Sequence, residues 1–228
     1  MSSVDGVAPP SPDEIARRVE RIRNQIADAG ADPAAVVLVA VTKGFGAQHV
    51  LAAQRAGLVD LGESYVQEFA DKRADAAVAA IEAEVRWHFI GRLQTNKVRA
   101  LGGVELVQSV DRMSLVSELA KRRPGQHVLV QVNIGDEPQK GGCSFGELDS
   151  LVEAANSGGL VVDGLMGVAR IADAAGTRRQ FDRLIEAADR HGLAIRSIGM
   201  SGDLEIAVAA GSTMVRVGTA IFGDRPPR

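Results

Sequence analysis

Val36-Val37-Leu38-Val39-Ala40-Val41-Thr42-Lys43 is a mainly aliphatic run with a single charge, which stands at its C-terminal end. A run of this kind is typical of a strand that is buried on both faces of a parallel sheet. In a closed barrel of parallel strands, active sites form at the carboxyl ends of the strands. Lys43 is therefore expected at the mouth of the barrel. It is either an amine held in an apolar setting for Schiff-base chemistry or a strand-end cation that extends into water.

Short apolar runs alternate with longer amphipathic segments along the rest of the chain, a pattern that predicts βα units and a parallel sheet. Strands are expected at residues 36–42, 58–61, 87–90, 104–107, 128–134, 161–166, 194–198 and 214–217. Helices are expected between them at 48–55, 66–83, 95–100, 113–122, 145–155, 177–190 and 203–209. We predict an α/β fold, a closed (β/α)8 TIM barrel. The alternative is an open doubly wound sheet, but Lys43-Gly44-Phe45-Gly46 lacks the glycine spacing of a dinucleotide-binding turn.

The N-terminal segment divides at Ser11. Residues 1–10 are small, polar and proline-containing, so a disordered lead-in is expected there. Ser11-Pro12-Asp13-Glu14 combines an N-cap serine, a proline at the first helical position and a glutamate suited to reciprocal capping. An extra helix should follow to about residue 29. Nothing in the composition divides the remainder, so residues 11–228 are predicted to form one domain.

The bulk composition excludes several classes of partner. The chain has 228 residues, 26 basic and 29 acidic, and a net charge of -3, so no electrostatic surface for nucleic acid or for a membrane is expected. Its single cysteine, Cys143, cannot form an internal disulfide, which together with the lack of a secretory leader predicts a cytoplasmic protein. The four histidines are scattered without metal-ligand spacing, so no metal site is predicted, and His88 is expected to be a hydrogen-bonded core residue. Because helices should cover the whole barrel, we predict a monomer.

The loops after the last two expected strands have the residue types of a phosphate site. Gly199-Met200-Ser201-Gly202-Asp203 follows the seventh strand, and Arg216-Val217-Gly218-Thr219 ends the eighth. Barrels often bind phosphate at these loops, because small residues let backbone N–H groups point inward and hydroxyls add donors. Ser201, Gly218 and Thr219 are the candidates, although the glycines can also simply permit tight turns. Arg216 should face the barrel interior and needs either a structural carboxylate or a ligand acceptor as partner.

Five blocks, in this order, resemble one protein family. They are Val39-Ala40-Val41-Thr42-Lys43, Gly62-Glu63-Ser64-Tyr65-Val66-Gln67-Glu68, Trp87-His88-Phe89-Ile90-Gly91-Arg92-Leu93-Gln94-Thr95-Asn96-Lys97, Gly199-Met200-Ser201-Gly202-Asp203 and Gly211-Ser212-Thr213-Met214-Val215-Arg216-Val217-Gly218-Thr219-Ala220-Ile221-Phe222-Gly223. The chain resembles the YggS/PROSC-type pyridoxal 5′-phosphate (PLP) homeostasis proteins, single-domain relatives of the alanine racemase N-terminal barrel (PLP fold type III).

The resemblance implies a role for each candidate residue. Lys43 matches the lysine that forms the internal aldimine with PLP, and Ser201, Gly218 and Thr219 match the phosphate cradle. Arg216 matches the arginine that faces the pyridine nitrogen and, being permanently charged, disfavours protonation of the ring. The family usually has Asn where Ser64 stands, so the resemblance transfers no role to position 64.

Two classes of function compete. The first is a PLP carrier that buffers the cofactor or delivers it, with PLP-dependent apo-enzymes as transient recipients, and we favour it. The second is an amino-acid racemase, which needs acid/base groups on both faces of its planar intermediate. The resemblance implies that in two-domain alanine racemases a tyrosine from the second domain is one of these groups, and no second domain is expected here. Tyr65, the only tyrosine, is a residual acid/base candidate, but we favour a ring that lines the wall of the site.

Other uses of the same residues are also open. A class I aldolase would share the lysine and the phosphate loops but gives no reason for Arg216. Lys97 and Lys140 are candidate secondary lysines for cofactor handling, although exposed cations are usually only solvated. Cys143 has no base near it in sequence, so it is interpreted as a loop residue and not as a nucleophile.

Overall fold

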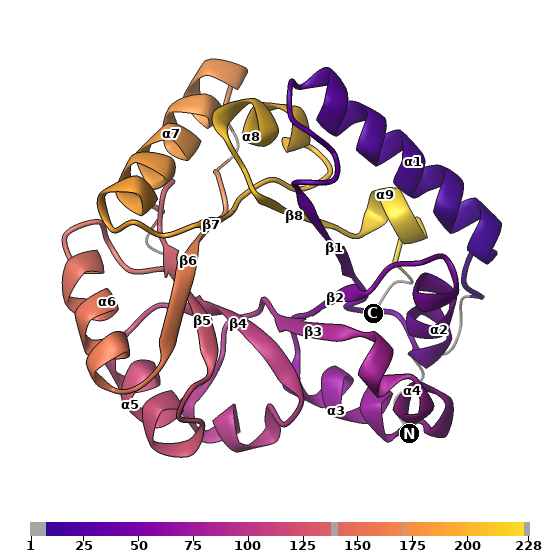
Figure 1. Ribbon diagram of the computed structural model, residues 1–228, viewed down its shortest axis with the longest axis horizontal. Coiled ribbons are helices and arrows are strands. Elements are labelled where there is room, and N and C mark those ends of the chain that lie inside the picture. The colour runs from indigo at the N-terminus through magenta and orange to yellow at the C-terminus, as the bar shows by residue number, and fades with distance from the viewer. Residues whose placement is uncertain (1–7, 138–140, 171, 226–228) are drawn as a thin grey trace.

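The computed structural model describes residues 8–137, 141–170 and 172–225, and in this part of the chain eight parallel strands close into a barrel (Figure 1). The strands follow one another in chain order around the barrel, and β8 pairs with β1. They are β1 (Val37–Val41), β2 (Asp60–Glu63), β3 (Arg86–Phe89), β4 (Val104–Val110), β5 (His127–Val132), β6 (Val161–Gly167), β7 (Ile195–Ser197) and β8 (Met214–Val217). The predicted closed (β/α)8 barrel is confirmed.

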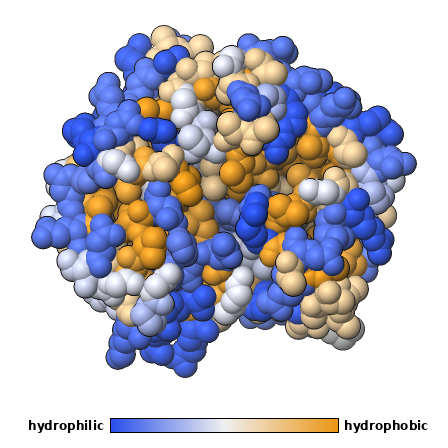
Figure 2. All heavy atoms as spheres, in the orientation of Figure 1, coloured by the Kyte–Doolittle hydropathy of each residue, from blue (hydrophilic) through white to orange (hydrophobic). Residues whose placement is uncertain are grey.

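Helices surround the strands in an outer ring (Figure 1). They are α1 (Pro12–Asp28), α2 (Ala47–Arg55), α3 (Val66–Ala74), α4 (Ala76–Ala80), α5 (Met113–Arg122), α6 (Leu148–Ser157), α7 (Ala174–Arg190), α8 (Leu204–Ala210) and α9 (Thr219–Phe222), with 3₁₀ turns η1 (Glu82–Glu84) and η2 (Thr95–Ala100). In the space-filling view, hydrophilic residues dominate the outer rim and hydrophobic residues show between them (Figure 2). Within the described residues, no helix has both the length and the apolar character needed to cross a membrane.

The predicted extra helix is α1. The Ser11 hydroxyl accepts a hydrogen bond from the Glu14 N–H at 3.2 Å, as expected for the N-cap. The Glu14 carboxylate does not return the bond and pairs instead with Arg18, so the capping is one-sided. Arg18 also donates to the carbonyl oxygen of Ile221 at 2.9 Å, which ties α1 to α9 directly after β8. Of the predicted lead-in, residues 1–7 lie outside the described part of the chain.

Several predicted boundaries are wrong. The helix expected at 66–83 is broken at Asp75, whose carboxylate accepts from the N–H groups of Ala77 and Val78 at 2.9 and 3.3 Å and so starts α4. The segment 95–100 is a 3₁₀ turn. The second strand begins two residues later than expected, at Asp60, and runs through Glu63. Both of these polar residues are buried, so the apolar run alone did not mark the bounds of the strand.

The interior of the barrel is partly apolar and partly polar. Val39, Leu106, Leu129, Met166 and Met214 form a separate buried cluster, whereas the larger core lies between the strands and the helices. Buried polar side chains share the barrel with this cluster, among them Asp60, His88, Gln108, Ser197 and Arg216. Hydrogen bonds between them, described below, cross the inside of the barrel from β2 to β8.

Candidate functional site

The predicted amine and one predicted phosphate loop lie at the same end of two neighbouring strands. All strands are parallel, so their carboxyl ends gather at one end of the barrel. Ala40 of β1 is paired with Val217 of β8, which sets Val41 beside Gly218. A Cβ atom added to Gly218 would lie 3.2 Å from the Val41 carbonyl oxygen. Lys43, two residues beyond Val41 and half-buried, is therefore close in the fold to the Gly218 loop.

The two predicted phosphate loops offer backbone donors. Ser201 and Thr219 are exposed, at the ends of β7 and β8. Within the described part of the chain, the N–H groups of Ser201, Gly202, Gly218 and Thr219 take part in no hydrogen bond. Gly199, which enters the first loop, has φ +100°, a left-handed conformation that favours glycine. Backbone donors left open at adjacent strand ends are suited to an anion such as phosphate.

Arg216 is buried inside the barrel, with 5% of its surface exposed. Nη1 donates to the carbonyl oxygen and hydroxyl of Ser197 at 2.7 and 2.6 Å, and Nη2 donates to the carbonyl oxygen of Gly167 at 2.9 Å. The sequence predicted either a carboxylate or a ligand as the partner of Arg216. The structure shows two backbone carbonyl oxygens and one serine hydroxyl instead. Burial lowers the pKa of Arg216 to about 10, although the charge of Asp203 opposes the shift. Nε donates to no residue that the structure describes, so it can donate to a ligand.

A buried ion pair supports the strand end that carries Lys43. The Lys72 ammonium on α3 pairs with the Glu63 carboxylate at the end of β2 and donates to the Thr42 carbonyl oxygen at 2.7 Å. The Thr42 hydroxyl donates to the same carboxylate at 2.6 Å. Lys72 and Glu63 are 4% and 0% exposed. Burial raises the pKa of Glu63, against the opposing effect of Lys72.

Sequence reasoning did not identify this pair as part of the site. The available signal was Lys72, a charged residue three positions after Phe69 on the face of α3 that turns out to be buried. The pair bonds to both the main chain and the side chain of Thr42, so the two residues support the backbone directly before Lys43. Beside them, the Gly44 N–H donates to the Glu68 carboxylate at 2.7 Å.

The remaining sequence candidates are more scattered. Ser64 lies at a half-buried bend, Tyr65 is 45% exposed, and Lys97 is exposed on η2. Lys140 lies outside the described residues. Cys143 is buried, and that burial, with the charge of Glu147, raises the pKa of its thiol to about 12, which is consistent with a loop residue and not a nucleophile.

The barrel corresponds to a known class of fold. The family model of the alanine racemase N-terminal domain matches residues 11–226, so the fold is a (β/α)8 barrel of that type. A pyridoxal phosphate homeostasis protein from Pseudomonas aeruginosa is 40% identical over 222 residues, covering 93% of this chain and 95% of that protein. The Escherichia coli protein of the same name is 38% identical over 230 residues, covering 93% and 97%. The chain belongs to the family of pyridoxal phosphate homeostasis proteins, which confirms the resemblance seen in its sequence.

Solved structures agree with this assignment. PipY of Synechococcus elongatus, determined with PLP bound, is 30% identical and superposes with a TM-score of 0.76, covering 92% of this chain and all (100%) of that one. Alanine racemase from Corynebacterium glutamicum superposes with a TM-score of 0.70 at 20% identity, covering 95% of this chain and 62% of that chain. The second likeness concerns the fold alone.

Proposed function

We propose that this protein binds PLP at the carboxyl ends of its strands and holds it for buffering or delivery, without significant turnover. The observation that carries the proposal is the register of β1 and β8, which brings Lys43 and the Gly218 loop to the same end of adjacent strands. A cofactor with an aldehyde and a phosphate needs an amine and an anion site within reach of each other. The relatives named for PLP homeostasis, and the PLP-bound PipY structure, support the same choice of ligand.

The residues present fit the chemical groups of PLP. The Lys43 amine would bond to the aldehyde carbon, with release of water. The unused N–H groups of the two loops, with the Ser201 and Thr219 hydroxyls, would bind the phosphate. Arg216 Nε would donate to the ring nitrogen, an acceptor, because a guanidinium can only donate. When bound, PLP supplies a conjugated ring that withdraws electrons, and donation from an arginine in place of a proton keeps that withdrawal weak.

Carriage is favoured over racemisation by the side chains at the strand ends. A racemase needs a second acid/base group opposite the lysine. The only tyrosine in the sequence, Tyr65, is 45% exposed, which favours a ring at the wall of the site over a group enclosed opposite the lysine. The buried pair of Glu63 and Lys72 contacts the main chain beside Lys43, which makes it a support for the amine.

Titration of the purified protein with PLP, followed by absorbance, tests the proposal. A visible absorption band should develop with saturation at one PLP per chain, and Lys43→Ala should abolish it. Lys97→Ala is the matched control, since Lys97 is an exposed lysine on η2, and it should titrate like the unchanged protein. An equal band in Lys43→Ala would overturn the proposal.

Two further assays separate carriage from turnover. The loaded protein should restore activity to a PLP-dependent apo-enzyme faster than the release of PLP into buffer allows, if delivery is direct. Alanine incubated with the loaded protein in deuterated water should exchange its α-proton no faster than with free PLP. Rapid exchange that is lost in Lys43→Ala would favour the racemase instead.

A further inference from the structure

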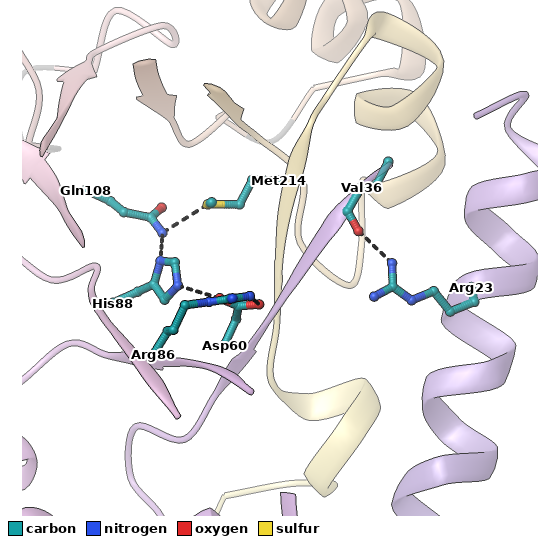
Figure 3. Close-up of polar contacts among 7 residues, drawn as sticks. All are labelled: Arg23, Val36, Asp60, Arg86, His88, Gln108 and Met214. Atoms are coloured by element: carbon teal, nitrogen blue, oxygen red, sulfur yellow. Dashed lines mark hydrogen bonds and ion pairs between the residues drawn. The ribbon is translucent and has the colours of Figure 1, made fainter. Parts of the chain in front are cut away.

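A line of buried hydrogen bonds begins at Asp60, in the interior of the barrel (Figure 3). The Asp60 carboxylate accepts from Arg86 Nε and Nη2 at 2.8 and 2.7 Å and lies 3.0 Å from His88 Nε2. The other ring nitrogen, His88 Nδ1, is 2.9 Å from Gln108 Nε2. The predicted core histidine is thus bonded through both nitrogens, and the line passes from β2 through β3 to β4.

The line continues from Gln108 across the barrel to Arg216. The Ser197 hydroxyl on β7 donates to Gln108 Oε1 at 2.7 Å and accepts from Arg216 Nη1 at 2.6 Å. Gln108 and Ser197 are both 0% exposed. Four links therefore connect Arg216, the residue proposed to meet the cofactor ring, with Asp60: Arg216 to Ser197, Ser197 to Gln108, Gln108 to His88, and His88 to Asp60.

The bonds run in one direction, from Arg216 to Asp60. Arg216 can only donate, so the Ser197 oxygen accepts from it, and the Ser197 hydroxyl donates in turn to Gln108 Oε1. The Gln108 oxygen therefore faces Ser197, and its amide group donates to His88 Nδ1. His88 is then left with its proton on Nε2, directed at the Asp60 carboxylate, which can only accept. Burial raises the pKa of Asp60, but the hydrogen bonds from His88 and Arg86 outweigh it and lower the pKa to about 2, so the carboxylate is an acceptor.

Burying these polar side chains costs free energy, which indicates that the network has a functional role. Polar groups buried in a barrel are expensive unless all are bonded, and an aliphatic interior, as in the neighbouring Val39, Leu106 and Leu129, would fold as well. A fully bonded network is rigid and specifies one arrangement of its members. The member with a further possible function is Arg216, whose Nε has no acceptor among the described residues.

We propose that Asp60, His88, Gln108 and Ser197 are positioning residues that hold the Arg216 guanidinium in one orientation and thereby set its hydrogen bond to the ring of bound PLP. The inference rests on the proposed function, because it takes the acceptor to be the ring nitrogen. Ser197 acts directly on Nη1, and the other three residues act through Ser197. The backbone carbonyls of Ser197 and Gly167 hold Arg216 in place when the hydroxyl is missing, so loss of a link should alter its orientation and not its burial.

The decisive comparison is between Ser197→Ala and Ser212→Ala. Ser212 is also a buried serine, 4% exposed, but its hydroxyl bonds only to the carbonyl oxygens of Arg196, Ile198 and Met214. Both variants lose one buried hydroxyl, and only the first touches Arg216. In Ser197→Ala we expect PLP affinity to fall by up to about tenfold, the factor equivalent to 1.4 kcal/mol, together with a shift in the absorption maximum of the bound cofactor. Ser212→Ala should leave the absorption maximum unchanged whatever it does to stability.

A second measurement needs no PLP. In the cofactor-free protein, ¹⁵N NMR of the imidazole should show His88 protonated at Nε2 and unprotonated at Nδ1.

A third measurement uses the variant Gln108→Met, which removes the middle link with little change in volume. The absorption maximum of the bound cofactor should shift again, by less than in Ser197→Ala.

The possible failures are distinguishable. If the unchanged protein binds no PLP, the proposed function fails. If it binds PLP and Ser197→Ala matches Ser212→Ala in both affinity and absorption, only the positioning role fails. A His88 ring protonated at Nδ1 would also overturn the inference, since the bonds would then not run from Arg216 to Asp60.

Discussion

Replacement of Lys72 by methionine tests the support under the predicted amine. The change keeps an unbranched side chain of similar length but removes the positive charge from beside Glu63. In the unchanged protein this charge lies against a carboxylate that is 0% exposed and has one oxygen, Oε2, without a hydrogen-bond partner among the described residues. Breaking a buried ion pair from one side typically costs about 3–5 kcal/mol. We expect Lys72→Met to lower the free energy of unfolding by about 3 kcal/mol, the lower end, because Glu63 can take up a proton.

The pH dependence gives a signature of that proton. Without Lys72, burial and the charge of Glu68 are opposed only by the Thr42 hydrogen bond, so the pKa of Glu63 in the folded protein rises further above the value of 4.5 that it has when unfolded. Between these two values the folded state binds more protons than the unfolded state. The free energy of unfolding of Lys72→Met should therefore increase as the pH is lowered from 7 to 5.

Urea denaturation of the cofactor-free protein, followed by circular dichroism, measures both effects. Lys72→Met/Glu63→Leu should recover most of the lost stability, because neither charge is then buried. Arg178→Met is the control, since the pair of Arg178 with Asp182 is 45% and 40% exposed and should contribute under about 0.5 kcal/mol. A loss below about 1 kcal/mol in Lys72→Met, or a double variant as unstable as the sum of the single ones, would refute this account of the strand end.

Three further outcomes are expected. The lowered pKa of Asp60, about 2 against 3.8, means that the unfolded state binds more protons between these values. When the pH falls from 4.5 to 2.5, the free energy of unfolding of the unchanged protein should therefore fall by about 1.5 kcal/mol more than that of Asp60→Asn. Gly199→Ala should lower the melting temperature, because φ at this position is +100° and the new Cβ would lie 2.8 Å from the Ala207 side chain. Gly202→Ala should leave the melting temperature unchanged, because no atom would lie within 4 Å of its new Cβ. Cys143, whose pKa is raised to about 12, should react with a disulfide reagent at pH 8 only after the protein is unfolded in urea, and fast reaction of the folded protein would contradict its burial.

The barrel was predictable because its signal is local. Each strand is a short apolar run, and the spacing of the runs leaves room for one helix between them. Boundaries failed where polar residues are buried, as at Asp60 and Glu63, since a sequence pattern treats such residues as the end of a strand. The break at Asp75 had a signal in the sequence, because aspartate is a strong N-cap. We missed it because the helical pattern continues on both sides of Asp75.

Only part of the candidate site could be predicted from the sequence. Lys43 and Arg216 are single charges in or next to apolar strands, so the sequence alone marks them as candidate site residues. The ion pair of Lys72 with Glu63 depends on how α3 packs against β2. The line from Asp60 to Arg216 depends on closure of the barrel, since Gln108 and Ser197 are 89 residues apart. Contacts of this kind follow from tertiary packing, and no local spacing marks them.

Covalent labelling tests the central claim most directly. The protein is saturated with PLP, reduced with borohydride, digested, and examined by peptide mass spectrometry. Our account predicts the reduced pyridoxyl group on the peptide that contains Lys43, and no such label in Lys43→Ala. A label found mainly on Lys97 or another lysine, or equal labelling with and without Lys43, would contradict it.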